Sequence, residues 1–204
     1  MHSVIELLTR TLCDTGPPAP ADAAYLYCQT TGSETSVFQT AKALITGARV
    51  SRILILKAGA LGGYPGFDAW EKRLRTMGLP ANRIEGVHLA DPVMIHTRIE
   101  SEALVRHAQS NGYRSLFVVA PPFHQLRAFM TAATVTMQEY PVLAIYNSPG
   151  QAMRWQESVV HSQGTLQASR AELIRAELDR IDRYQKKGDL ASFARVLAYL
   201  NARG

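Results

Sequence analysis

The sequence contains few cysteines and no long apolar run, and each absence excludes a class of protein. Its two cysteines, Cys13 and Cys28, have neither the spacing of metal ligands nor the density of a disulfide-stapled domain. We therefore expect two buried, unpaired thiols and a reducing, cytoplasmic setting. The apolar segments, such as Leu116–Ala120, are far too short to span a bilayer, so no membrane span is predicted. The first ten residues place Glu6 within an apolar run and carry no basic leader, unlike a secretory signal.

Common catalytic and nucleotide-binding motifs are also missing. The chain contains neither a Gly-x-Ser-x-Gly nucleophile elbow nor a glycine pattern of the dinucleotide-binding or P-loop type. No cluster of His, Asp and Glu has metal-ligand spacing, so no metal site is predicted. The formal net charge of +5 is spread along the chain rather than gathered among aromatic residues, which disfavours a nucleic-acid partner.

Short apolar strands alternate regularly with amphipathic helices through most of the chain. This alternation predicts an α/β domain of three layers, in which a mostly parallel sheet of about five strands has helices on both faces. We expect the domain to span residues 1–150, with an N-terminal helix at 2–13 and a core at 22–150. The expected strands are Ala23–Cys28, Arg52–Lys57, Arg83–Leu89, Ser115–Ala120 and Pro141–Tyr146.

Residues 151–204 are expected to form a pair of helices packed on the same domain. An apolar stripe that includes Leu173 and Ile181 lies beside a mixed-charge face that includes Glu177, which is typical of a surface helix. Asp189 is expected to cap the second helix of the pair. Such helices either pack on their own domain or form a dimer surface.

The stretch Ser115–Met130 is the predicted chemical centre of the chain. Its strand ends at two prolines, because a proline cannot donate a ladder hydrogen bond. The next helix, expected from about Phe123 to Gln138, carries His124 and Arg127 three residues apart in its first turn, where unpaired amides favour an anion. We predict that both are catalytic, with His124 neutralising or protonating an oxygen and Arg127 binding an anion. The alternatives are a hydrogen-bonded core histidine and a salt bridge from Arg127 to a neighbouring helix.

Polar residues and glycines follow the strands, where ligands bind in parallel α/β sheets. Asp68 is a candidate catalytic base, and an N-cap is the alternative. Thr97 and Glu100 have the spacing of a capping box, which is a sufficient structural reason for both. The candidate ligand-binding residues are Thr30, Thr31, Gly59, Gly62, Gly63, His96, Thr97, Glu100 and Asn147.

Several segments between about Asp22 and Gly150 together match a family pattern. The most specific is a hydrophobic strand followed by Phe-His-x-x-Arg-Ala, here Phe123–Ala128. The other segments are Gly78–Pro80, Thr97 with Glu100 and Glu102, and Gly66–Ala69, in which Asp68 stands where the family has Glu. In these segments the chain resembles the YdcF-like domain family of bacterial proteins. The resemblance implies a Rossmann-like fold and S-adenosylmethionine as a possible cofactor, whereas the activity of the family is poorly defined.

Three functions are compatible with these features. The first is binding of a small anionic ligand, phosphate-bearing or nucleotide-like, at the carboxyl edge of the sheet, with hydrolase or transferase chemistry on it. The second is binding of S-adenosylmethionine, in which Asp68 or Glu100 would lie near the positive end of the ligand. The third is a non-catalytic interaction protein that forms a homodimer through its C-terminal helices.

Overall fold

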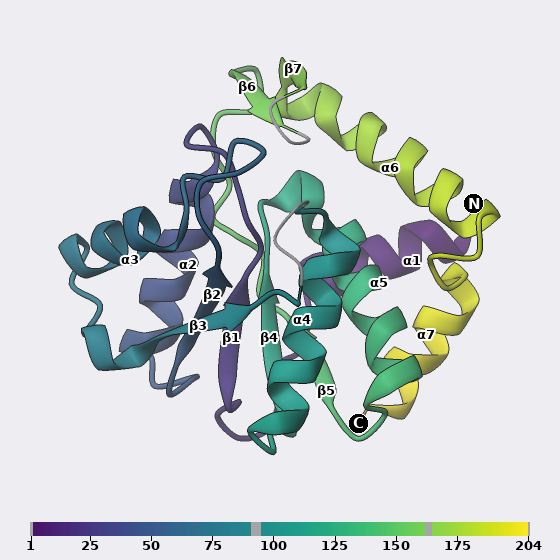
Figure 1. Cartoon of the computed structure of the whole chain (residues 1–204). Coiled ribbons are helices and arrows are strands. Elements are labelled where there is room, and N and C mark those ends of the chain that lie inside the picture. Colours follow the sequence, from purple (N-terminus) through teal and green to yellow (C-terminus); the bar gives the residue numbers. More distant parts are fainter. Residues whose placement is uncertain (1, 91–94, 162–164, 204) are drawn as a thin grey trace.

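The fold is built on a five-stranded sheet in which every strand is parallel to its neighbours (Figure 1). The computed structural model describes residues 2–90, 95–161 and 165–203. The strand order β3-β2-β1-β4-β5 is that of a Rossmann-type sheet, which confirms the predicted fold class. The strands are β1 (Ala23–Leu26), β2 (Ile53–Lys57), β3 (Ile84–His88), β4 (Ser115–Val119) and β5 (Ala144–Asn147).

Helices cover both faces of the sheet and form the two outer layers (Figure 1). On one face, Phe38 and Trp70 share a hydrophobic cluster with the strand residue Ile55. On the other face, Tyr25 and Leu54 belong to a second cluster with the remaining helices. Successive strand residues thus point to opposite faces, as the period of a β-strand requires. The helices are α1 (His2–Leu12), α2 (Glu34–Thr46), α3 (Phe67–Thr76), α4 (Thr97–Ser110), α5 (Pro122–Glu139), α6 (Arg170–Lys186) and α7 (Phe193–Ala202), with a 3-10 turn at Ala81–Arg83.

Helix α5 is buried along most of its length, from Phe123 to Thr136. It packs on β4 and β5 and also contacts α1, α4, α6 and α7, so its sides that face away from the sheet are covered too. A helix buried all round must satisfy its polar side chains within the protein. Thr131 and Thr134 do so by donating to carbonyl groups four residues earlier, whereas His124 and Arg127 need partners from other elements.

The C-terminal segment contacts helices of the sheet domain, and it contains strands as well as helices. An antiparallel hairpin of β6 (Ser158–His161) and β7 (Leu166–Ser169) precedes α6. The prediction that Asp189 caps the last helix is wrong, because α7 begins later and the Ser192 side chain accepts from the Arg195 amide at its N-cap. The helices α6 and α7 contact α5, and α7 also contacts α1.

The structure bears on two expectations from composition, which concern the cysteines and membrane-spanning helices. Both cysteines are unpaired, but Cys13 is exposed and Cys28 only half-buried, so the prediction of two buried thiols is wrong. Among the described residues, no helix is both long and apolar enough to cross a membrane.

A buried ion pair fixes the end of the chain to the sheet. The guanidinium of Arg203 donates to both carboxylate oxygens of Asp14 and to the carbonyl of Ile145, and it lies 4.1 Å from the ring centroid of Tyr146. Asp14 in turn accepts from the backbone and the side chain of Asn147. Burial alone would raise the pKa of Asp14, but these hydrogen bonds outweigh burial and the pKa is lowered.

We predict that Arg203→Met lowers the free energy of unfolding by about 3 kcal/mol, because it leaves the buried Asp14 carboxylate without its counter-ion. Urea denaturation at pH 7 measures the loss. Since the lowered pKa stabilises the fold only above the unfolded pKa, the difference from the unmodified protein should shrink below about pH 4. Arg195→Met, at an exposed position of α7, is the control and should change stability by less than about 0.5 kcal/mol. Equal stability of the two variants would contradict the prediction.

Candidate functional site

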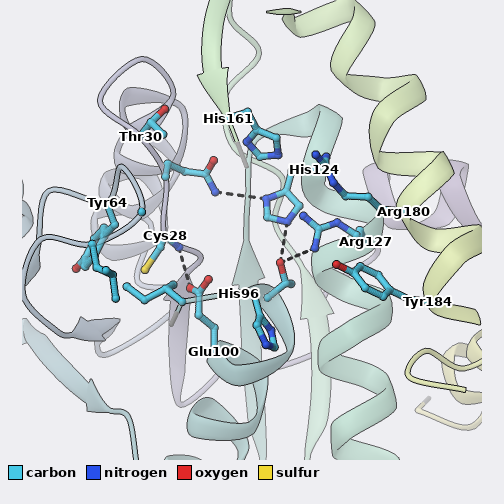
Figure 2. A pocket seen from close by; sticks show the side chains of 15 residues that line it. Cys28, Thr30, Tyr64, His96, Glu100, His124, Arg127, His161, Arg180 and Tyr184 are labelled. Carbon is cyan, nitrogen blue, oxygen red and sulfur yellow. Dashed lines mark hydrogen bonds between the residues drawn. The ribbon is translucent and has the colours of Figure 1, made fainter. Parts of the chain in front are cut away.

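A cavity lies beyond the carboxyl ends of β1 and β4, where the order of the strands reverses. From β1 the chain runs to α2 on one face of the sheet, and from β4 it runs to α5 on the other. Open parallel sheets bind ligands at this position. The cavity has a volume of about 200 Å³. The residues that line it are Cys28, Gln29, Thr30, Leu61, Gly62, Tyr64, Ile95, His96, Thr97, Glu100, His124, Arg127, His161, Arg180 and Tyr184 (Figure 2).

His124 lies in the first turn of α5 and its ring contributes to the cavity wall. Its Nδ1 atom is 3.4 Å from the Gln29 side-chain nitrogen, which also donates to the Tyr27 carbonyl. An amide nitrogen only donates, so Nδ1 accepts and the ring proton resides on Nε2, which lies 3.5 Å from the Thr97 hydroxyl. Burial, and then the charge of Arg127, hold the pKa of His124 well below its usual value. His124 is therefore a neutral hydrogen-bond donor here rather than a base.

Arg127 forms a bidentate ion pair with Glu177 of α6. Its Nε and Nη2 atoms donate to the two carboxylate oxygens at 2.5 and 3.3 Å, and its Nη1 atom donates to the Thr97 hydroxyl at 2.6 Å. The structure thus shows the salt bridge to a neighbouring helix that the sequence left open as an alternative. Arg127 nevertheless also lines the cavity.

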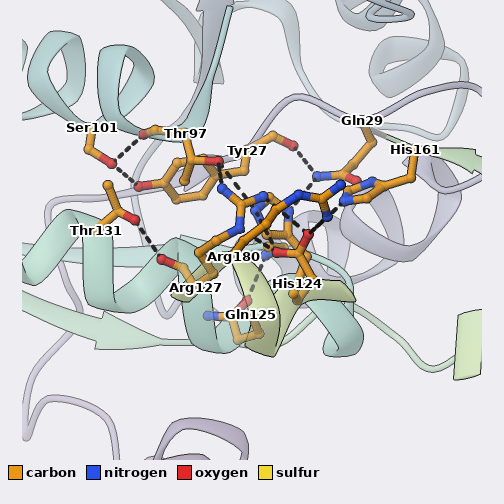
Figure 3. A network of polar contacts seen from close by, with 12 residues as sticks. Tyr27, Gln29, Thr97, Ser101, His124, Gln125, Arg127, Thr131, His161 and Arg180 are labelled. Carbon is orange, nitrogen blue, oxygen red and sulfur yellow. Dashed lines mark hydrogen bonds and ion pairs between the residues drawn. The ribbon is translucent and has the colours of Figure 1, made fainter. Parts of the chain in front are cut away.

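Glu177 pairs with Arg127, His161 and Arg180, and we call these four residues the Glu177 cluster. Figure 3 shows its three labelled members, Arg127, His161 and Arg180, close together. In addition to Arg127, Arg180 donates to its Oε1 atom at 2.6 Å, and His161 Nε2 lies 3.0 Å from the same oxygen. Burial would raise the pKa of Glu177, but Arg127 and the other members lower it well below its usual value. Glu177 is therefore ionised, and it orients both arginines.

Glu177, His161 and Arg180 were not predicted as site residues from the sequence. Glu177 was missed because it was assigned to the solvent-exposed, mixed-charge face of its helix. The spacing contains the signal that identifies it: Leu173, Glu177 and Ile181 are four residues apart and lie on one stripe of α6. All three side chains are buried. An acidic residue at the centre of an apolar stripe needs a buried partner. Nothing comparable in the sequence marks His161 or Arg180.

Glu100 lies on the opposite side of the cavity from α6 and is also buried. Its Oε2 atom accepts from the Cys28 amide at 2.9 Å and from the Tyr25 hydroxyl at 3.0 Å. The predicted capping box of Thr97 and Glu100 is wrong, because the N-cap of α4 is His96, whose Nδ1 atom accepts from the Ile99 amide. Burial raises the pKa of Glu100, and its hydrogen bonds offset only part of that shift.

Cys28 lines the cavity beside Glu100 but is not an activated nucleophile. Burial, and then the charge of Glu100, raise the pKa of its thiol well above the usual value. The thiol form, rather than the more nucleophilic thiolate, is therefore favoured.

The structure brings together only part of the predicted site. Besides His124 and Arg127, the predicted residues that line the cavity are Thr30, Gly62, His96, Thr97 and Glu100. Asp68 is exposed and lies with Gly59 in a separate hollow beside the start of α3, whose N-cap is Gly66. Thr31 and Gly63 are exposed turn residues. Asn147 is bonded to Asp14 and Gln125, so it holds structural elements together.

The donors of the site do not form a metal centre. Within the part of the chain that the structure describes, no three His, Cys, Asp or Glu side chains are placed to hold a metal ion. Glu177 lies near His124 and His161, but two arginines are bonded to its carboxylate.

The fold and the cavity define a class: a Rossmann-like α/β protein with an arginine-lined cavity at the switch point of its sheet. Comparison of the chain with protein-family models, with curated proteins and with solved structures found no match. The resemblance to the YdcF-like family therefore stays a hypothesis that depends on the motif residues alone.

We predict that Glu177→Gln destabilises the protein by about 3–5 kcal/mol, because two arginines lose the carboxylate that neutralises them in a buried environment. Chemical denaturation followed by circular dichroism measures this loss. Asp179→Asn removes a carboxylate from an exposed position on the same helix and should change stability by less than about 0.5 kcal/mol. If both variants unfold at the same denaturant concentration, Glu177 does not hold the buried charges together.

Proposed function

We propose that this protein binds a small anionic ligand, phosphate-bearing or nucleotide-like, in the cavity at the carboxyl edge of the sheet. The observation that carries the proposal is the presence of Arg127 and Arg180 in the cavity wall, oriented by a single carboxylate. An arginine guanidinium pairs with phosphate and carboxylate oxygens through parallel N–H groups.

The balance of charge supports an anion. Arg127 and Arg180 are both positive, and Glu177 compensates one of these charges. The raised pKa of Glu100 favours its uncharged form, and the lowered pKa of His124 favours a neutral ring. The side chains of the cavity thus carry an excess of positive charge, and a bound anion would offset it.

The size of the cavity favours a small ligand. Its volume of about 200 Å³ is below the ~300–1,000 Å³ of typical ligand pockets. A second hollow of about 270 Å³ shares His96, Thr97, Arg127 and Tyr184 with it. A phosphate or a small phosphate ester fits the first space, whereas a nucleotide would need both.

The same residues suit a hydrolase or transferase that acts on the bound anion. Arg127, Arg180 and the Nε2–H group of His124 are donors fixed in a buried setting, which stabilises negative charge that develops in a transition state. The nucleophile in such chemistry would be water or a second substrate, since the Cys28 thiol has a raised pKa.

Binding of S-adenosylmethionine is the competing proposal, and one observation favours it. Glu100 is a carboxyl group in the cavity wall, and in its ionised form it would attract a sulfonium or ammonium group. Arg127 and Arg180 act in the opposite direction, because they repel such a cation.

We predict that inorganic phosphate or adenosine monophosphate raises the unfolding temperature of the protein and that S-adenosylmethionine does not. In Arg180→Gln, phosphate affinity measured by calorimetry should fall roughly tenfold or more, because a charge-assisted hydrogen bond is lost. Arg175→Gln removes the same charge from an exposed position of α6 and should leave the affinity unchanged.

Two results would contradict this proposal. One is stabilisation by S-adenosylmethionine without stabilisation by any phosphate compound. The other is an equal loss of affinity in Arg180→Gln and Arg175→Gln, which would show that only the overall charge of α6 matters.

A further inference from the structure

The cavity has two chemically different sides. Figure 2 shows Arg127, Arg180 and Tyr184 on one side and Cys28 and Glu100 on the other. The first side carries the positive charge of the site. The second side carries polar groups that the Glu177 cluster does not use.

Glu100 contributes a buried carboxyl group to this second side. Its Oε2 atom is bonded to the Cys28 amide and the Tyr25 hydroxyl. Glu100 is 3% exposed and lines the cavity, and a hydrogen bond from the Cys28 side chain also lowers the pKa of its carboxyl group. A carboxyl group that lines a cavity can also contact a ligand.

Gln29, which also lines the cavity, has an unsatisfied polar atom. Its side-chain nitrogen is engaged by the Tyr27 carbonyl and His124, but its Oε1 atom is buried without a partner. A buried acceptor that lacks a donor costs free energy. Because Gln29 lines the cavity, a ligand that donates a hydrogen bond would remove this cost.

The type of donor follows from the charge of Glu100. An uncharged carboxyl group donates a proton from one oxygen, so it pairs with a group that can accept as well as donate. A hydroxyl group does both, whereas an ammonium group only donates and requires the ionised form. Burial favours the uncharged form of Glu100, and the nearby arginines repel an ammonium group.

We propose that the ligand of this cavity is a small phosphate ester of a polyol, whose hydroxyl groups bind to Glu100 and Gln29 while its phosphate binds to Arg180 and Arg127. This assignment rests on the proposed anion site, and it adds the substrate class. Glu100 is then the residue that determines specificity for a hydroxylated ligand.

The test compares glycerol 3-phosphate with propyl phosphate, which has the same carbon chain and phosphate but no hydroxyl groups. Titration calorimetry on the full chain should show roughly tenfold tighter binding of glycerol 3-phosphate, the effect of one or two hydrogen bonds in a buried site. Glu100→Gln should keep this preference, because the amide N–H replaces the carboxyl O–H as donor. Glu102→Gln, on the same helix and paired with Arg98 near the surface, is the control.

Glu100→Met removes the hydrogen-bonding group at similar length and should reduce the preference to about one while inorganic phosphate still binds. If this variant does not fold, the unmodified protein and Glu100→Gln decide the question. Equal affinity of the two esters for the unmodified protein overturns the inference and leaves the anion site intact. Loss of the preference in Glu100→Gln, or its survival in a folded Glu100→Met, overturns the role of Glu100. If neither ester nor inorganic phosphate binds, the proposed function itself fails.

Discussion

The buried ion pair between Arg127 and Glu177 is the interaction on which the candidate site depends. A single buried charge costs several kcal/mol, so each partner requires the other. Arg127 belongs to α5 of the sheet domain, whereas Glu177 belongs to the C-terminal helix α6. The arginine therefore acquires its orientation only when the C-terminal segment has packed on the domain. The site is a property of both parts of the chain, and neither part alone contains it.

The hairpin that precedes α6 is tied to the other wall of the cavity. The Thr30 hydroxyl donates to the Val160 carbonyl at 2.6 Å, and Arg170 donates to the Gly32 carbonyl at 2.6 Å. The first bond joins the hairpin to the loop after β1, and the second joins the first residue of α6 to the same loop, while Glu177 of α6 is paired with Arg127 of α5. Because the C-terminal segment contacts both sides of the switch point, His161, Arg180 and Tyr184 can contribute to the cavity wall.

The sheet could be predicted because its signals are local. Each central strand is a short apolar run ended by turn residues. Such a run predicts a strand buried on both faces without information about the strands beside it. The hairpin lacked such a signal, since β6 alternates buried Val159 and His161 with exposed Ser158 and Val160 over four residues. A strand of this length is stabilised by its pairing partner, which the sequence does not identify.

Only those residues of the candidate site that belong to the sheet domain could be predicted from the sequence. His124, Thr97 and Glu100 each lie at an element end that sequence patterns locate, and parallel strands bring such ends to one edge. Their partners in the C-terminal segment are determined by how that segment packs on the sheet domain. The sequence shows that Glu177 shares a stripe with Leu173 and Ile181, but not that this stripe faces Arg127.

The N–H donors that the protein itself already uses limit which groups of a ligand the cavity could bind. An arginine has five N–H donors, and Glu177 and Thr97 together engage Arg127 through its Nε, Nη1 and Nη2 atoms. These contacts fix the guanidinium before any ligand arrives, so little conformational entropy remains to be lost on binding. Most of the N–H donors that remain for a ligand belong to Arg180. Its Nη1 atom donates to Glu177. A second ionised carboxylate in the same space would cancel this remaining charge, and the raised pKa of the buried Glu100 opposes its ionisation. The proposed selection of an anion would therefore rely on fixed donors on one side of the cavity, and uncharged polar groups of a ligand would be recognised on the other side.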